Sequence, residues 1–175
     1  MPSSNVFLVG MMGSGKSTVG RLLSQRLKGR FVDLDSEIQK KEKITISEIF
    51  ETKGEPYFRE LESEVLQGVL KKKGLVISTG GGIVLRSANV KAMRDSGIVI
   101  YLKTSVDVLL RRLKGSKDRP LLKTRSWREK VREIDKERRP FYEKAAHAEV
   151  GTNLKTPLRV AREIETFLEK YDEKH

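Results

Sequence analysis

The segment Gly10–Ser17 constrains the fold of this chain more than any other part of its sequence. Its residues, GMMGSGKS, match the pattern G-x-x-x-x-G-K-[ST]. The mainly apolar segment Asn5–Val9 precedes it and predicts a strand, while the apolar residues that follow have helical spacing. Glycines at these places let the backbone curl, so that its N–H groups can bind phosphate oxygens at a helix N-terminus. The segment therefore predicts a nucleoside triphosphate site on a strand–loop–helix unit.

Two side chains of this loop have an expected role. Lys16 is expected to reach the β- and γ-phosphates as a point charge, and the Ser17 hydroxyl is expected to bind Mg²⁺. The plainer alternative is a glycine-rich turn that only begins a helix, and the flanking strand and helix argue against it.

The rest of the chain alternates short apolar segments with longer helical patterns. Further strands are expected at Phe31–Asp33, Leu75–Ser78, Ile98–Leu102 and about Ala148–Val150. This alternation predicts an α/β fold, in which helices cover both faces of a parallel sheet. Right-handed crossovers would place the carboxyl ends of the strands along one edge, where open α/β sheets bind ligands.

Composition and charge narrow the class of protein. The 175 residues fit one domain, 1–175, and they contain no cysteine, which excludes disulfides, thiolate metal sites and a cysteine nucleophile. No apolar run reaches the length of a membrane span, and the N-terminus lacks the features of a signal peptide. We therefore expect a cytoplasmic protein with no membrane partner. Its net charge of +12 favours anionic partners.

The positive charge is concentrated in one part of the chain. Residues 103–144 contain 15 Lys and Arg and 7 Asp and Glu, a net charge of +8. Within this part, residues 114–126 include a glycine and a proline and show little helical pattern, which predicts a mobile loop. A helix of about 18 residues is expected to follow from near Ser126.

Two carboxylates lie at the end of the second predicted strand, in the segment FVDLD. At positions i and i+2 of a strand, Asp33 and Asp35 would point to the same side of the sheet. One could then face a metal and its water, and the other a substrate hydroxyl. The alternative is that Asp35 or Ser36 caps the helix that follows.

Several further residues indicate an anionic acceptor. Arg59 and Glu62 are three residues apart and can pair on one helix face, although an ordinary surface ion pair would look the same. Gly80–Gly82 follow the third strand and allow close backbone approach to a ligand, or merely a permissive turn. Arg119 and Arg138 add guanidinium groups, which bind carboxylates and phosphates bidentately, although each alone could be a solvated surface charge.

The order and spacing of these motifs resemble those of the shikimate kinases, which are small P-loop kinases of aromatic amino acid synthesis. The matching segments span nearly the whole chain: GMMGSGKS with TVGRLLS, FVDLDSEI, ISEIFETKGEPYFRELE, VISTGGG, RPLL and ERRPFY. The resemblance implies a three-layer α/β/α fold with five parallel strands. It also implies a substrate-binding helical region at about 34–62 and a lid over ATP at about 114–126.

The resemblance further implies which residues bind the phosphates, the metal and the adenine of ATP. The residues implied for the phosphates are Gly13, Ser14, Gly15, Lys16, Ser17 and Thr18. Mg²⁺ would be held by Ser17 and, through water, by Asp33. Arg112 would pack on the adenine, and Arg119 would reach the transferring phosphoryl group.

For the acceptor, the resemblance implies that Asp35 binds ring hydroxyls of shikimate beside the attacking 3-hydroxyl. Arg59, Arg138 and the backbone N–H of Gly81 would hold the shikimate carboxylate, and Glu62 would orient Arg59. The residues implied in catalysis are Lys16, Asp35 and Arg119.

The implied reaction is transfer of the γ-phosphoryl group of ATP to the 3-hydroxyl of shikimate by a Mg²⁺-dependent enzyme. No sustained heptad or obvious exposed apolar patch indicates a dimer, so we expect a monomer. Three alternatives remain at this point. Another small P-loop kinase could act on a polyol acid such as gluconate, and a related binding module could have lost catalysis. The charge of +12 could also belong to a nucleic-acid-dependent NTPase, although the sequence carries no nucleic-acid-binding motif.

Overall fold

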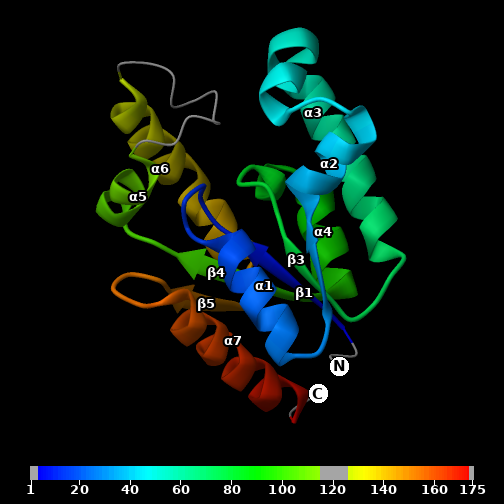
Figure 1. The fold of residues 1–175 in the computed structure, drawn as a ribbon, viewed down its shortest axis with the longest axis vertical. Coiled ribbons are helices and arrows are strands. Elements are labelled where there is room, and N and C mark those ends of the chain that lie inside the picture. The colour runs from blue at the N-terminus through cyan, green and yellow to red at the C-terminus, as the bar shows by residue number, and fades with distance from the viewer. Residues whose placement is uncertain (1–3, 115–125, 174–175) are drawn as a thin grey trace.

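The structure, a computed structural model, describes residues 4–114 and 126–173. In this part of the chain, five parallel strands form one sheet in the order β2-β3-β1-β4-β5 (Figure 1). The strands are β1 (Asn5–Val9), β2 (Arg30–Asp33), β3 (Leu75–Ser78), β4 (Gly97–Lys103) and β5 (Ala148–Gly151). All five predicted strands are confirmed, with their ends shifted by no more than one residue.

Helices connect the strands and cover both faces of the sheet (Figure 1). The helices are α1 (Lys16–Arg26), α2 (Leu34–Glu42), α3 (Ile46–Leu70), the 3₁₀ helix η1 (Ile83–Leu85), α4 (Ser87–Ser96), α5 (Val106–Leu113), α6 (Trp127–Ala145) and α7 (Pro157–Asp172). The helix expected from near Ser126 is α6, with 19 residues. None of the helices in the described part of the chain is long and apolar enough to span a bilayer.

The central strand β1 shows why three layers form. All of its residues are buried, and successive side chains enter opposite cores. Val6 and Leu8 pack in the core that contains the apolar residues of α1 and α7. Phe7 and Val9 pack in the second core, with residues of α3, α4 and α6. The predicted three-layer α/β/α architecture is therefore confirmed.

Helix α2 and the first half of α3 stand beyond the sheet and have a small core of their own (Figure 1). Ile38, Ile49, Phe58 and Leu61 form this core, and each is at most 4% exposed. Gly54, with φ of 81°, interrupts the helical conformation inside α3. These two helices contain the region 34–62. Their separate core holds in position the side chains that they direct toward the sheet.

Candidate active site

The loop after β1 adopts a conformation that requires glycine. Gly10, Gly13 and Gly15 have φ values of 147°, 80° and 96°. A Cβ on Gly10 would lie 2.9 Å from the carbonyl oxygen of Leu102, and a Cβ on Gly13 would lie 3.1 Å from the Leu113 side chain. The loop therefore curls tightly against its neighbours before α1 begins at Lys16.

Lys16 lies over this loop and is only 9% exposed. Its ammonium group donates hydrogen bonds to the carbonyl oxygens of Gly10 at 2.7 Å and Met11 at 2.9 Å. These contacts hold a positive charge beside the N-terminus of α1, whose partial positive charge also favours anions. The loop therefore combines a lysine charge with a helix N-terminus, and both features favour the binding of phosphate.

Ser17, Asp33 and Ser78 bring three oxygen-bearing side chains together at the carboxyl ends of β2 and β3. The Ser17 hydroxyl donates to Asp33 Oδ2 at 2.6 Å and lies 3.2 Å from Ser78 Oγ. Asp33 Oδ1 accepts from the backbone N–H of Ser36 at 3.1 Å and thereby caps α2. The helix cap considered for Asp35 or Ser36 is thus supplied by Asp33.

This oxygen cluster has the chemistry that Mg²⁺ prefers. Mg²⁺ commonly takes one or two protein oxygens and completes its octahedron with water and phosphate oxygens. No group of three or more His, Cys, Asp or Glu that could hold a metal occurs among the described residues. The pair of Ser17 and Asp33 therefore suits a metal that is bound together with a nucleotide.

Asp35 does not lie on a strand, so the prediction that it shares a strand face with Asp33 is wrong. Strand β2 ends at Asp33, and Asp35 lies in the first turn of α2. Its carboxylate instead approaches the loop after β3, where a Cβ on Gly80 would lie 3.1 Å from Asp35 Oδ1. The same Cβ would lie 2.6 Å from Glu62 Oε1, so the two carboxylates flank one glycine.

Each of the other two glycines of that loop leaves space that an arginine side chain occupies. A Cβ on Gly81 would lie 3.3 Å from Arg138 Nη1, and a Cβ on Gly82 would overlap the Arg59 guanidinium group. Side chains at these positions would displace the charged groups, so the glycines do more than permit a turn. The loop is the place where the residues expected to bind the acceptor meet.

Arg59 and Glu62 form a buried ion pair. Arg59 Nη1 donates to Glu62 Oε2 at 2.8 Å, and the two side chains are 12% and 1% exposed. This burial excludes the surface ion pair considered above. Burial raises the pKa of Glu62, the Arg59 charge opposes that rise, and the nearby Asp35 charge adds to it. Glu62 Oε1 is buried and has no hydrogen-bond partner among the residues that the structure describes.

Tyr142 connects Arg138 to the glycine loop, a role that was not predicted from the sequence. Its hydroxyl donates to the Gly81 carbonyl oxygen at 2.5 Å and accepts a hydrogen bond from Arg138. Burial raises the pKa of Tyr142 far above its ordinary value, so this hydroxyl stays neutral. The neighbouring Arg139 instead pairs with Asp135 at 2.6 Å. Only the first of the two adjacent arginines therefore contacts this loop.

A cavity of about 260 Å³ lies on the other side of the phosphate loop. Its lining residues are Ser14, Gly15, Thr18, Val19, Arg112, Thr152, Lys155, Pro157 and Val160. Arg112 joins two lining segments, because Nη1 lies 3.2 Å from the Gly13 carbonyl oxygen and Nη2 lies 3.3 Å from that of Thr152. Burial lowers the pKa of Arg112.

The structure adds residues to the nucleotide side and leaves one predicted part of it untested. Thr152, Lys155 and Pro157 line it, although the sequence assigned no residue there. Arg119 and nearly all of the expected lid at 114–126 lie outside the described residues.

Comparison with known proteins identifies the family. A model of the shikimate kinase family matches residues 12–169. A shikimate kinase of Sulfurihydrogenibium sp. is 43% identical over 166 residues, which cover 95% of this chain and 98% of the relative. One of Persephonella marina is 44% identical over 160 residues, which cover 91% and 96% of the two chains.

Solved structures agree with this comparison. Shikimate kinase from Acinetobacter baumannii in complex with shikimate matches with a TM-score of 0.93 and 39% identity, over 96% of this chain and 94% of that one. A gluconokinase from Sinorhizobium meliloti has a TM-score of 0.64 at 17% identity, which shows a shared fold alone. Because the family model spans most of the sequence and close relatives match nearly end to end, the chain belongs to the shikimate kinase family.

Proposed function

We propose that this chain phosphorylates shikimate with ATP at the carboxyl edge of its sheet, through the residues described above. The observation that carries the residue assignment is the Gly80–Gly82 loop, at which Asp35, Arg59 and Arg138 converge next to β3. Strand β3 is the hydrogen-bonded neighbour of β1, which leads into the phosphate loop. A phosphoryl donor and a carboxylate-bearing acceptor can therefore bind side by side.

For the donor, the loop from Gly13 through Thr18 binds the phosphates, and the cavity beside Arg112 and Thr152 takes the adenosine. Ser17 and Asp33 are the residues that would hold Mg²⁺, which neutralises charge on the β- and γ-phosphates when bound. Lys16 leaves its two carbonyl partners and pairs with phosphate oxygens. Arg119, outside the described residues, keeps its expected role at the transferring group.

For the acceptor, Arg59 and Arg138 bind the shikimate carboxylate together with the Gly81 N–H, and Asp35 binds the 3-hydroxyl. The hydroxyl oxygen attacks the γ-phosphorus while the bond to the β–γ bridging oxygen breaks and ADP leaves. Asp35 accepts the hydroxyl proton as this bond forms. Lys16 stabilises the charge that develops on the equatorial oxygens, so the residues act by position and electrostatics.

Tyr142 acts on the acceptor through Arg138, and replacing it tests that link. Tyr142→Phe removes the hydroxyl that binds both Arg138 and Gly81, a loss of about 1 kcal/mol. We expect the KM for shikimate to rise about fivefold to tenfold, while the KM for ATP changes little. Tyr101→Phe is the matched control, because Tyr101 is equally buried and stacks on Tyr142 at 5.2 Å. Equal effects of the two variants on KM would contradict the role of Tyr142.

A panel of acceptors tests the proposed function itself. Coupled release of ADP is measured with ATP and Mg²⁺ in the presence of shikimate, shikimate methyl ester, gluconate or no acceptor. We expect fast turnover with shikimate, much weaker turnover with the ester, whose carboxylate charge is gone, and background rates otherwise. Equal turnover with gluconate, or with no acceptor, would contradict the assignment. The monomeric state and the cytoplasmic location stay predictions.

A further inference from the structure

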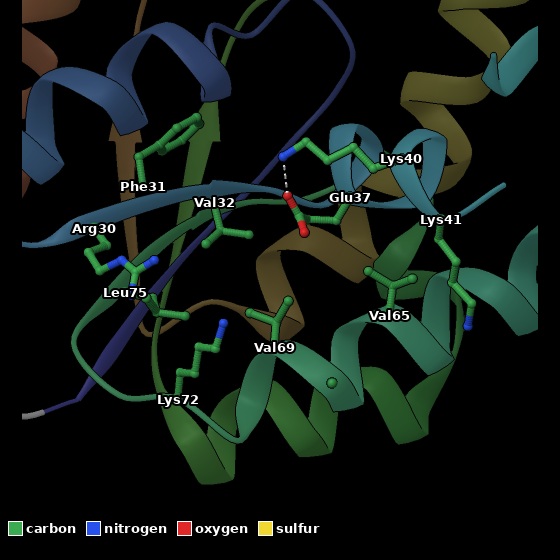
Figure 2. Close-up of a pocket in the computed structure, with 11 residues that line it drawn as sticks. Arg30, Phe31, Val32, Glu37, Lys40, Lys41, Val65, Val69, Lys72 and Leu75 are labelled. Atoms are coloured by element: carbon green, nitrogen blue, oxygen red, sulfur yellow. Dashed lines mark hydrogen bonds and ion pairs between the residues drawn. The ribbon is translucent and has the colours of Figure 1, made fainter. Parts of the chain in front are cut away.

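A cavity of about 440 Å³ lies at the β2 edge of the sheet, between that strand and α3 (Figure 2). Its volume is within the range of small-molecule sites. The lining residues are Arg30, Phe31, Val32, Glu37, Lys40, Lys41, Val65, Gly68, Val69, Lys72 and Leu75. None of them belongs to the phosphate, adenosine or shikimate groups assigned above.

The position of this cavity also separates it from the phosphotransfer site. Arg30, the first residue of β2, pairs in register with Leu75, the first residue of β3. Both lie at the amino ends of their strands, whereas the phosphate loop and the Gly80–Gly82 loop follow carboxyl ends. A ligand could therefore occupy the cavity while ATP and shikimate are bound.

The cavity has an apolar floor that the helix leaves uncovered. Figure 2 shows Val32 on β2 and Val69 on α3 pointing toward one another across the space. Gly68 lies on the same helix, and a Cβ there would meet no heavy atom within 4 Å. The absence of a side chain at this position keeps the floor open to a ligand.

The rim of the cavity is strongly basic. Its charged side chains are Glu37 and the four cations Arg30, Lys40, Lys41 and Lys72. Two of these cations are already neutralised, since Lys40 lies 2.7 Å from Glu37 and Lys41 lies 2.5 Å from Glu64.

The other two cations lack such a partner. In residues 4–114 and 126–173, no carboxylate forms an ion pair with Arg30 or Lys72. In Figure 2 these two side chains lie on the same side of the cavity, away from Lys41. A guanidinium group and an ammonium group beside an apolar floor complement a carboxylate on a hydrocarbon body.

We infer that this cavity binds a small amphipathic carboxylate, whose hydrocarbon part lies on the valine floor and whose charge meets Arg30 and Lys72. The probe is 2-naphthoate, titrated into ¹⁵N-labelled enzyme that is saturated with ADP, Mg²⁺ and shikimate. We expect saturable shifts of the Val32 and Val69 amides. The uncharged analogue 2-naphthylmethanol is expected to bind about fivefold to tenfold more weakly. Shifts confined to other residues, or equal binding of both probes, would overturn the inference.

Two matched pairs of variants locate the probe. Gly68→Leu places a side chain in the open space and should abolish the shifts, while Gln67→Leu, at an exposed neighbouring position outside the lining, should keep them. A glycine replaced in a helix interior does not cost helix stability. Lys72→Met should weaken binding several-fold, and Lys71→Met should not. All four variants are expected to keep wild-type kinase activity. Wild-type affinity in Gly68→Leu or Lys72→Met would contradict the assignment.

Discussion

Lys16→Met is expected to lower kcat for shikimate phosphorylation by about 10²–10³-fold, in line with the loss of one group that stabilises transition-state charge. Methionine has a similar length but carries no charge, and it cannot donate to phosphate oxygens. The fold should be retained, because the ammonium group donates to the loop carbonyl oxygens of Gly10 and Met11 and belongs to no apolar core. Steady-state kinetics and the far-UV circular dichroism spectrum measure the two effects separately.

The control for this variant is Lys28→Met. Lys28 follows the same helix and is exposed, so the same chemical change there should leave kcat unaltered. Turnover of Lys16→Met close to that of Lys28→Met would contradict the assignment of the phosphate site. A far-UV spectrum that shows unfolding would contradict the claim that the lysine serves phosphate rather than the core.

Asp35→Asn is expected to lower kcat by about 10²–10⁴-fold, the usual contribution of a general base. The amide can still accept a hydrogen bond from the 3-hydroxyl, so the KM for shikimate should change far less than kcat. The KM for ATP should be unchanged, because Asp33 is the carboxylate that accepts the hydrogen bond from Ser17. Initial rates as a function of both substrates separate these parameters.

Asp95→Asn provides the comparison for this loss, since Asp95 is exposed on α4 and pairs with Lys91. A variant that keeps wild-type kcat would show that another group accepts the proton.

The sequence predicted the fold well because the strands are governed by local pattern and burial. Strand β1 is apolar from Val6 to Val9, and all of its residues are buried in the centre of the sheet. The conformation of the phosphate loop could be predicted equally well, since Gly10, Gly13 and Gly15 occupy positive-φ positions that few other residues tolerate. In both places a short segment contains the physical reason for its own conformation.

The position of Asp35 was predicted less well, because local alternation does not show where a strand ends. The chain turns into α2 after Asp33, whose carboxylate caps the helix by accepting from the Ser36 N–H. A capping aspartate and a strand aspartate look the same in the segment FVDLD. The segment alone therefore does not show that Asp35 lies on α2 rather than on the strand, nor that its carboxylate approaches Gly80.

The features that could not be predicted from the sequence depend on contacts between residues far apart in the chain. The hydrogen bond from Tyr142 to Gly81 joins residues that are 61 positions apart. The cavity at β2 likewise depends on how α3 packs beside an edge strand, and its open floor at Gly68 has no sequence signature. Neither feature is contained in one segment, so neither could be derived from spacing.

Analysis of the product tests the central claim most directly. The enzyme is incubated with ATP, Mg²⁺ and shikimate, and ³¹P and ¹H NMR spectra identify the phosphorus-containing products. The account predicts one new phosphomonoester, coupled to the proton on C3 of shikimate, formed in equal amount with ADP. Release of inorganic phosphate without a shikimate ester, or phosphate on a different hydroxyl, would contradict it.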